Sequence, residues 1–288
     1  MRIRTSDSYY RAGGGPSNPY GENSNNVFIN NTIIARQGEL LPDGNLGGYG
    51  YAVRISVRDY NRSLNITFKD NTFIAFVNSS FISDGKEDHD VAAVYTNDIM
   101  SGNNILFENN KFISNYRPLY ISGCDTLFLN NKIIREGAVN NNYNPFVIGY
   151  WTARATNNIF LNQSFVNSSS FDSMIFKGGE GGNLKDFSVA WFLDVYVRDL
   201  NNTALSGASV LLSNSEGFVF GGSTDSSGFL RINLTEFRKQ CSFSPCTPFT
   251  ANYNPHSLVV GKPGYVSNDR SISINQSTIT EVSLVKAS

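Results

Sequence analysis

A motif that occurs five times constrains the fold of this 288-residue chain more than any other feature. Each copy has a phenylalanine, one variable residue, a polar pair that is mostly Asn-Asn, another residue and two apolar residues. The copies begin at Phe28, Phe68, Phe107, Phe128 and Phe160. Successive copies are 40, 39, 21 and 32 residues apart, so the motif is kept while the segments between copies vary. A constant unit with variable connections is typical of a solenoid.

Each copy is expected to form a strand, a tight turn and a second strand. Asn and Asp tolerate a left-handed backbone and bond their own main chain, which suits them to the turn. A further apolar run follows each copy, at residues 53–57, 91–95, 119–121, 146–148 and 174–176. Three short strands per coil, with coils stacked about 4.8 Å apart, bury their inward side chains in continuous columns. The alternative is a set of antiparallel hairpins, but hairpin turns favour Asn-Gly over Asn-Asn.

The second residue of each polar pair is predicted to stack above its counterpart in the next coil. These residues are Asn31, Asn71, Asn110 and Asn131. Stacked amides satisfy one another, as they do in other arrays of aligned strands. We therefore predict an asparagine ladder through the coils. Gln163 stands at this position in the fifth copy, so we expect the ladder to be interrupted there.

Residues 25–189 resemble the right-handed parallel β-helix family, the pectate-lyase-like superfamily and its Asn-rich relatives, through these repeated motifs. The resemblance implies a right-handed coil. Members of this family include polysaccharide lyases, glycoside hydrolases, tailspikes and surface adhesins, so the fold alone does not assign a function.

From Ala190 onward the chain changes to alternating strands with regular turn signals, which is typical of a β-sandwich. Its Gly207-Ala208-Ser-Val210 step, Thr224-Asp225-Ser-Ser-Gly228 turn and Lys262-Pro-Gly-Tyr265 segment resemble the carboxypeptidase regulatory-like domain, a transthyretin-like sandwich. The resemblance implies a non-catalytic accessory module. The residues between Cys241 and Cys246 form an insertion relative to that family.

The sequence thus predicts an all-β protein, a short right-handed parallel β-helix with a C-terminal β-sandwich. Three segments are expected: an N-terminal arm or partial coil at 1–24, the β-helix at 25–189 and the sandwich at 190–288.

The charge balance argues against nucleic acid as a partner. Lys and Arg number 23 against 24 Asp and Glu, a formal charge of −1, which gives no electrostatic reason to expect nucleic acid.

No run approaches the roughly 18 apolar residues of a membrane span, so no membrane span is predicted. The first residues lack the apolar core of a signal peptide. A trimmed signal, another export route and a piece of a longer chain all stay open.

Nine Asn-x-Ser/Thr sequons are candidate glycosylation sites. They are Asn30, Asn61, Asn65, Asn78, Asn162, Asn167, Asn201, Asn233 and Asn275. Chance is the alternative explanation, because a chain rich in Asn and Ser generates sequons freely. Their spread over both halves of the chain fits an exported glycoprotein.

The cysteines also favour an exported protein. Cys241 and Cys246 bracket Ser-Phe-Ser-Pro, close enough for a small disulfide worth about 2 kcal/mol. Two free thiols in a reducing compartment are the alternative. Cys124 is expected to be a free, buried, small apolar residue. A disulfide indicates an extracellular or cell-surface protein, a virion surface included.

The acidic segment Asp84–Asp90 is the best candidate for chemistry. Its carboxylates and His89 suit Ca²⁺ binding or acid–base catalysis, although a solvated insertion loop is the preferred interpretation. The chain's two histidines, His89 and His256, have no partner at metal-ligand spacing, and no nucleophile elbow or phosphate-binding loop is present. We predict no catalytic residue, no metal site and no cofactor.

The functional hypothesis is a structural or adhesive surface component that acts by binding and assembly. The first coil of a β-helix exposes unpaired strand edges, and residues 1–24 are too rich in Gly and Ser to form a cap unaided. We therefore expect either contact with other protein chains at the N-terminal end or continuation of the polypeptide before Met1, with surface glycans as a second class of partner. The alternative is a carbohydrate-active enzyme, a polysaccharide lyase or glycoside hydrolase of the β-helix type.

Overall fold

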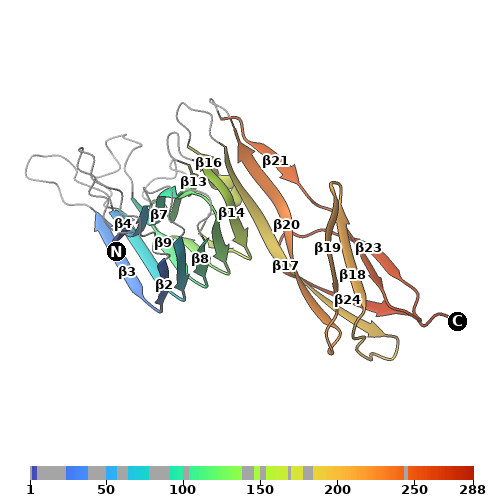
Figure 1. The fold of residues 1–288 in the computed structure, drawn as a ribbon. Helices are drawn as coiled ribbons and strands as arrows, with labels where there is room; N and C mark the ends of the chain where they lie inside the picture. The colour runs from blue at the N-terminus through green and yellow to red at the C-terminus, as the bar shows by residue number, and fades with distance from the viewer. Residues whose placement is uncertain are drawn as a thin grey trace, which may run out of the picture. The chain divides into compact units, whose positions relative to one another are not determined.

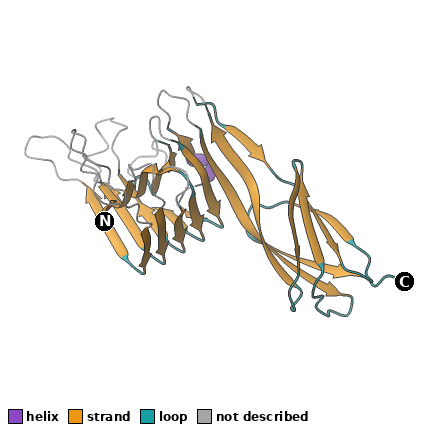
Figure 2. Cartoon of the chain, in the orientation of Figure 1, coloured by secondary structure: helices purple, strands orange, loops and turns teal. Residues whose placement is uncertain are grey.

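The computed structural model describes eleven stretches of the chain. These are residues 2–4, 24–37, 50–56, 64–77, 91–99, 104–137, 146–149, 154–167, 170–177, 184–242 and 246–288. Their regular structure is strand throughout, apart from a short 3₁₀ helix at Phe171–Ser173 (Figure 2). The all-β class predicted from the sequence is confirmed.

The chain divides into two compact units, which are described separately. The first unit is Met1–Phe187 with Gln240–Phe249, and the second is Ser188–Lys239 with Thr250–Ser288. The boundaries of the three segments predicted from the sequence remain a prediction.

The first unit is built from three parallel sheets (Figure 1). In order, one sheet contains β1 (Arg2–Arg4), β4 (Gly50–Ser56), β7 (Val91–Ile99), β10 (Leu119–Gly123), β13 (Phe146–Ile148) and β16 (Met174–Phe176). A second sheet contains β2 (Ser24–Ile29), β5 (Leu64–Lys69), β8 (Asn104–Glu108), β11 (Thr126–Leu129) and β14 (Ala155–Leu161). The third contains β3 (Thr32–Gln37), β6 (Thr72–Val77), β9 (Lys111–Ser114), β12 (Lys132–Arg135) and β15 (Ser164–Val166).

Three consecutive strands therefore make one coil, and each strand pairs with its counterpart one coil further on. Strand β2 pairs in parallel with β5, and β3 pairs in parallel with β6. This is the architecture of a parallel β-helix. Hairpin pairing between β2 and β3 is not what the chain adopts.

The phenylalanines that open the motif form one continuous column inside the coils. Phe28, Phe68, Phe107, Phe128 and Phe160 lie in register, with stacked rings whose centroids are 5.0, 4.8, 5.1 and 4.7 Å apart. Phe73 of β6 and Phe112 of β9 meet this column edge-on from the third sheet. Burying one such side chain stabilises the fold by roughly 1.5–3 kcal/mol, so the columns hold the coils together.

The turn between the second and third sheets explains the polar pair. Its first residue has a positive φ in every coil, at 56°, 56°, 56°, 54° and 54° for Asn30, Asp70, Asn109, Asn130 and Asn162. Asn and Asp adopt this left-handed conformation at lower cost than other side chains. The backbone therefore dictates the first residue of the pair, and side-chain contacts dictate the second.

The second unit contains two sheets. One includes β17 (Lys185–Asp199), β20 (Phe229–Cys241), β21 (Phe249–Asn252) and β24 (Thr278–Leu284), with β24 parallel to β17. The other is antiparallel, in the order β19 (Gly217–Ser223), β18 (Ser209–Asn214), β22 (His256–Gly261) and β23 (Asn268–Ile272). Alternate residues of both sheets are buried, among them Val195, Val197, Val210, Leu212, Ile232, Leu234, Leu258, Val260, Val282 and Leu284.

The Thr-Asp-x-x-Gly segment forms a tight turn before β20. Asp225 Oδ1 accepts hydrogen bonds from Ser227 N at 2.8 Å and Phe229 N at 3.0 Å. Hydrogen bonds from the Ser227 side chain and from the backbone lower the pKa of Asp225. Gly228 has a φ of 72°, and a Cβ there would lie 2.5 Å from the carbonyl oxygen of Val197. Glycine is therefore required at the end of this turn.

His256 gives the second unit a pH dependence that can be measured. It is only 1% exposed, and burial lowers the pKa of His256 below its ordinary value of 6.5. The folded state thus resists protonation of His256. The contribution of neutral His256 to the unfolding free energy is fully present above pH 6.5 and is lost as the pH falls through the lowered pKa. We expect urea unfolding to show a falling free energy from about pH 7 to about pH 5.

Replacing His256 with glutamine is expected to flatten that decline. The chain's other histidine, His89, provides the matched control. If the decline survives in the His256→Gln variant and disappears with His89→Gln, the titrating group is not His256.

Candidate assembly site at the first coil

The structure places the four predicted ladder asparagines at equivalent turns and joins them by hydrogen bonds. Asn31 Nδ2 donates to Asn71 Oδ1 at 3.0 Å. Asn71 Nδ2 donates to Asn110 Oδ1 at 3.1 Å, and Asn110 Nδ2 donates to Asn131 Oδ1 at 3.1 Å. The backbone N–H of the same three donors reaches the same oxygens at 2.8, 2.9 and 2.8 Å. Each acceptor oxygen thus binds two N–H groups of the preceding coil.

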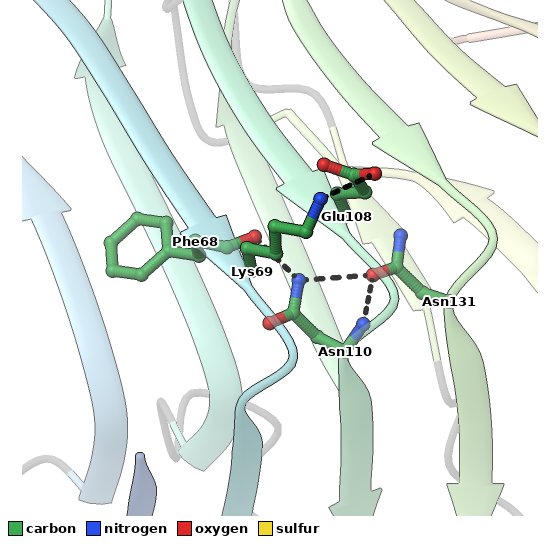
Figure 3. Close-up of polar contacts among 5 residues, drawn as sticks. All are labelled: Phe68, Lys69, Glu108, Asn110 and Asn131. Carbon is green, nitrogen blue, oxygen red and sulfur yellow. Dashed lines mark hydrogen bonds and ion pairs between the residues drawn. The ribbon is translucent and has the colours of Figure 1, made fainter. Parts of the chain in front are cut away.

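Each inner asparagine also reaches back to the preceding coil. Asn110 Nδ2 donates to the carbonyl oxygen of Phe68 at 2.9 Å, as Figure 3 shows. Asn71 and Asn131 make the same bond to the phenylalanine carbonyls of their preceding coils, at 2.9 Å in both cases. Asn71, Asn110 and Asn131 are buried, so these bonds form out of contact with water.

The ladder has a direction, and its N-terminal end is an acceptor. Side-chain oxygens accept from the preceding coil, while backbone and amide nitrogens donate to the following coil. No described residue donates to Asn31 Oδ1, and Asn31 is exposed. Its Nδ2 bonds instead to Ile29 O in its own coil, at 3.0 Å. The first coil therefore presents a hydrogen-bond acceptor that the inner coils all use.

Gln163 ends the ladder at its C-terminal end. Its Nε2 donates to Phe128 O at 2.8 Å and to Leu161 O at 2.7 Å, so it keeps the bond to the preceding coil. Its Oε1 is buried without a hydrogen-bond partner among the described residues, and Asn131 does not donate to it. The extra methylene group of glutamine moves the amide away from the ladder position.

Three apolar side chains of the first coil are largely exposed. Val27, Ile29 and Ile34 are 59%, 55% and 53% exposed. Ile29 lies in register with Lys69, which forms an ion pair with Glu108 of the third coil at 3.1 Å (Figure 3). The position that carries charge in the second and third coils is therefore an exposed isoleucine in the first.

The strands of the first coil are also the edges of their sheets. Strands β1, β2 and β3 each end the strand order of their sheet. Phe28 is half-buried and stacks on Phe68 with one face of its ring. Unpaired edges and exposed apolar side chains attract a further chain. Together, Val27, Phe28, Ile29, Asn31 and Ile34 define the candidate assembly site.

The candidate glycosylation sites differ in their exposure. Asn30, Asn167, Asn201, Asn233 and Asn275 are exposed. Asn65 and Asn162 are half-buried, and Asn162 Nδ2, the atom a glycan would take, donates to Asn130 Oδ1 at 2.8 Å. Asn61 and Asn78 lie outside the described residues. Exposure therefore favours the first five as acceptors.

The structure joins Cys241 and Cys246 in a disulfide, as the sequence predicts. Cys124 is free and buried, and its Sγ accepts hydrogen bonds from Thr156 N at 3.4 Å and Thr156 Oγ1 at 3.3 Å. Cys124 thus has a packing role inside the coils.

The acidic segment Asp84–Asp90 lies outside the described residues, as does the N-terminal arm apart from β1 and Ser24. Within the described stretches, no group of three or more His, Cys, Asp or Glu side chains is placed to hold a metal ion. The described part of the chain also has no helix of the length and hydrophobicity that crossing a membrane requires.

A second set of polar turns escaped the sequence interpretation. Asp125, just before β11, and Asn157, within β14, have φ values of 57° and 59°, and Asn157 Nδ2 donates to Asp125 Oδ1 at 2.6 Å. Asn158 Nδ2 donates to Gly123 O at 2.9 Å, which repeats the bond made by the main ladder. The sequence signal for these turns is a polar pair that ends two residues before the motif phenylalanine, Asp125-Thr126 before Phe128 and Asn157-Asn158 before Phe160. The exposure of Val27, Ile29 and Ile34 had no such signal, because the sequence does not show which face of a first coil stays uncovered.

Comparisons with known proteins do not assign a family. No family model matches the sequence, and no curated protein matches it. Among solved structures, the Bacillus anthracis TIE protein is 18% identical over 43% of this chain and 19% of its own, with a TM-score of 0.26. A 3-chlorocatechol 1,2-dioxygenase from Rhodococcus opacus is 11% identical over 34% and 60%, with a TM-score of 0.25. A shaft pilin from Lactobacillus rhamnosus GG is 14% identical over 42% and 59%, with a TM-score of 0.18. The chain spans less than two thirds of each of these structures, and at such TM-scores the likeness carries no argument about function.

Proposed function

We propose that this chain is an extracellular structural or adhesive surface protein that acts by binding and assembly through the first coil of its β-helix. The observation that carries the proposal is the assembly site itself. It combines three sheet edges, exposed Val27, Ile29 and Ile34, and the acceptor Asn31 Oδ1, to which no described residue donates. In this proposal the coil is right-handed and pectate-lyase-like, and the second unit is a carboxypeptidase regulatory-like module that supports it without catalysis.

An uncovered first coil is unfavourable in an isolated chain. Exposed sheet edges template pairing with other chains, and proteins blunt them with charge, proline or a covering element. The described strands β2 and β3 have neither proline nor an acidic residue, and their one charged side chain is Arg36. A surface of this kind is explained by a partner that covers it.

The proposed location is outside the cytoplasm, on a cell or virion surface. The Cys241–Cys246 disulfide supports it, because disulfides persist in oxidising compartments. Five exposed sequon asparagines offer glycan acceptors over both units.

Site-specific photo-crosslinking in the native source tests the proposal. A photoreactive residue at position 29 is expected to give a covalent adduct of higher mass with another chain. The same residue at position 279 is the matched control, because Ile279 is an isoleucine 67% exposed on β24 of the second unit. Equal labelling at both positions, or none at position 29, would contradict assembly through the first coil.

Turnover is tested separately with uronate and neutral polysaccharides. The proposal expects no release of reducing or unsaturated ends by the purified chain. Release of either product would favour the alternative, a polysaccharide lyase or glycoside hydrolase of the β-helix type.

A further inference from the structure

We infer that the first coil receives the carboxyl-terminal end of a parallel β-coil from a different chain, one whose last turn has the form Phe-x-Asn-Asn. The inference rests on the proposed function and names the partner of the same site. It follows from the direction of the asparagine ladder, which sets which end of a coil can dock.

The vacant groups of the first coil define what the partner must supply. Inside the stack, Asn110 Oδ1 accepts from both N and Nδ2 of Asn71, at 2.9 and 3.1 Å. Asn31 Oδ1 lacks these two donors among the described residues. A docking coil therefore presents an asparagine whose backbone N–H and side-chain amide are both unpaired. Such an asparagine occurs in the last coil of a ladder, because donors point toward the following coil.

A second contact fixes the residue three positions before that asparagine. Asn71 Nδ2 donates to Phe28 O, and Asn110 Nδ2 donates to Phe68 O, so each amide holds the carbonyl of the preceding coil. No carbonyl of this kind is present for Asn31 in the part of the chain that the structure describes, and its Nδ2 donates to Ile29 O instead. The docking coil offers this carbonyl from its own phenylalanine, whose ring then stacks on Phe28 as Phe28 stacks on Phe68 at 5.0 Å.

A second copy of this chain does not supply the required end. Two first coils would bring Asn31 Oδ1 against Asn31 Oδ1, an acceptor against an acceptor. The opposite end of the ladder is closed by Gln163, whose Nε2 is committed to Phe128 O and Leu161 O. The partner is therefore another chain with a complete asparagine turn.

A synthetic peptide with the sequence of residues 104–114, which holds one Phe-x-Asn-Asn motif between two strands, is the probe. It is titrated into the full chain by calorimetry, as is the same peptide with Asn110→Ala. The alanine peptide is expected to bind about tenfold more weakly, because it lacks the side-chain donor. In the Asn31→Ala chain the two peptides are expected to bind equally, which isolates the contact between the two asparagines.

The matched control on the chain is Asn201→Ala, an exposed asparagine of the second unit, which is expected to leave both affinities unchanged. Peptides that bind the natural chain equally, or a preference that survives Asn31→Ala, would overturn the inference. Analytical ultracentrifugation of the chain alone is expected to show no self-association through this coil. A dimer that Ile29→Lys abolishes would show that a second copy takes the site, and would overturn the inference too.

The two proposals fail differently. An adduct at position 29 in the native source, together with peptides that do not distinguish Asn110, leaves assembly standing and removes the ladder partner. Coupling between Asn31 and Asn110 without any adduct at position 29 supports the ladder contact and removes the assembly role in that source.

Discussion

The Phe107→Ala variant is expected to lose about 3–5 kcal/mol of unfolding free energy, the largest effect of any single substitution considered for this chain. Phe107 is fully buried at the middle of the aromatic column. Its ring stacks on Phe68 at 4.8 Å and on Phe128 at 5.1 Å, and it meets the edge of Phe112 at 5.7 Å. Alanine removes these contacts and leaves a cavity that flanking coils, fixed by their own strand pairing, cannot fill. Urea unfolding followed by circular dichroism measures the loss.

Phe28→Ala is the matched control, since Phe28 occupies the same position in the first coil. Phe28 is half-buried and has a ring neighbour in the second coil, so the loss is expected to be about 1–2 kcal/mol. Equal losses for Phe28→Ala and Phe107→Ala in the isolated chain would mean that the first coil is covered on both sides. That result would contradict an open assembly site.

The Asn110→Ala variant is expected to lose about 3 kcal/mol. The substitution leaves the buried N–H of Asn71 and the buried carbonyl of Phe68 without their partners. It also breaks the side-chain bonds to Asn71 and Asn131. Unpaired buried groups cost more than the hydrogen bonds themselves contribute, which is why the effect exceeds that of a surface amide. Equilibrium unfolding measures the loss, and amide hydrogen exchange at Asn71 is expected to accelerate.

Asn31→Ala makes the same chemical change at the exposed end of the ladder. It removes the bond from Asn31 Nδ2 to Asn71 Oδ1 but keeps the one from the backbone N–H, and water remains able to satisfy the groups left behind, so the loss is expected to stay below about 1 kcal/mol. If Asn110→Ala proves as mild as Asn31→Ala, the ladder does not stabilise the coils.

Much of the coil could be predicted because its signals are local. The apolar runs 146–148 and 174–176 coincide with β13 and β16, and the polar pairs mark the turns in all five coils. Each of these features depends on residues within a few positions of one another. Loop length does not matter to them, so the uneven spacing of the copies did not hide the repeat.

Other features depend on partners far away in the chain. Strand β17 begins at Lys185, before the change of pattern at Ala190, and both Lys185 and Asp186 are buried. Two adjacent charged residues carry no strand signal, and Asp186 is held there by the backbone N–H of Asn157 at 2.8 Å. The parallel pairing of β17 with β24 joins segments about 85 residues apart, which periodicity does not reveal.

The assembly site likewise combines features that are local in the sequence with features that depend on distant contacts. The asparagine at position 31 follows from the repeat, but its vacant oxygen follows from the direction of the ladder, which becomes visible only when donors and acceptors are assigned. The exposure of Ile29 likewise depends on the absence of a coil before it among the described residues. A pattern in the sequence identifies the members of a stack, and the three-dimensional contacts identify which member stands at the end.

The left-handed turn has a consequence for glycosylation. In the first and fifth coils the residue at this corner is the asparagine of a sequon, Asn30 and Asn162. The three coils between them occupy the corner with Asp70, or with an asparagine followed two residues later by lysine, so none of the three is an acceptor. Sugars on adjacent coils would grow from points only about 4.8 Å apart, too close for two branched chains. The sequence instead places its two corner sequons four coil steps, roughly 19 Å, apart, and because Asn162 Nδ2 is already bonded to Asn130 Oδ1, the exposed Asn30 is the corner at which a glycan is expected.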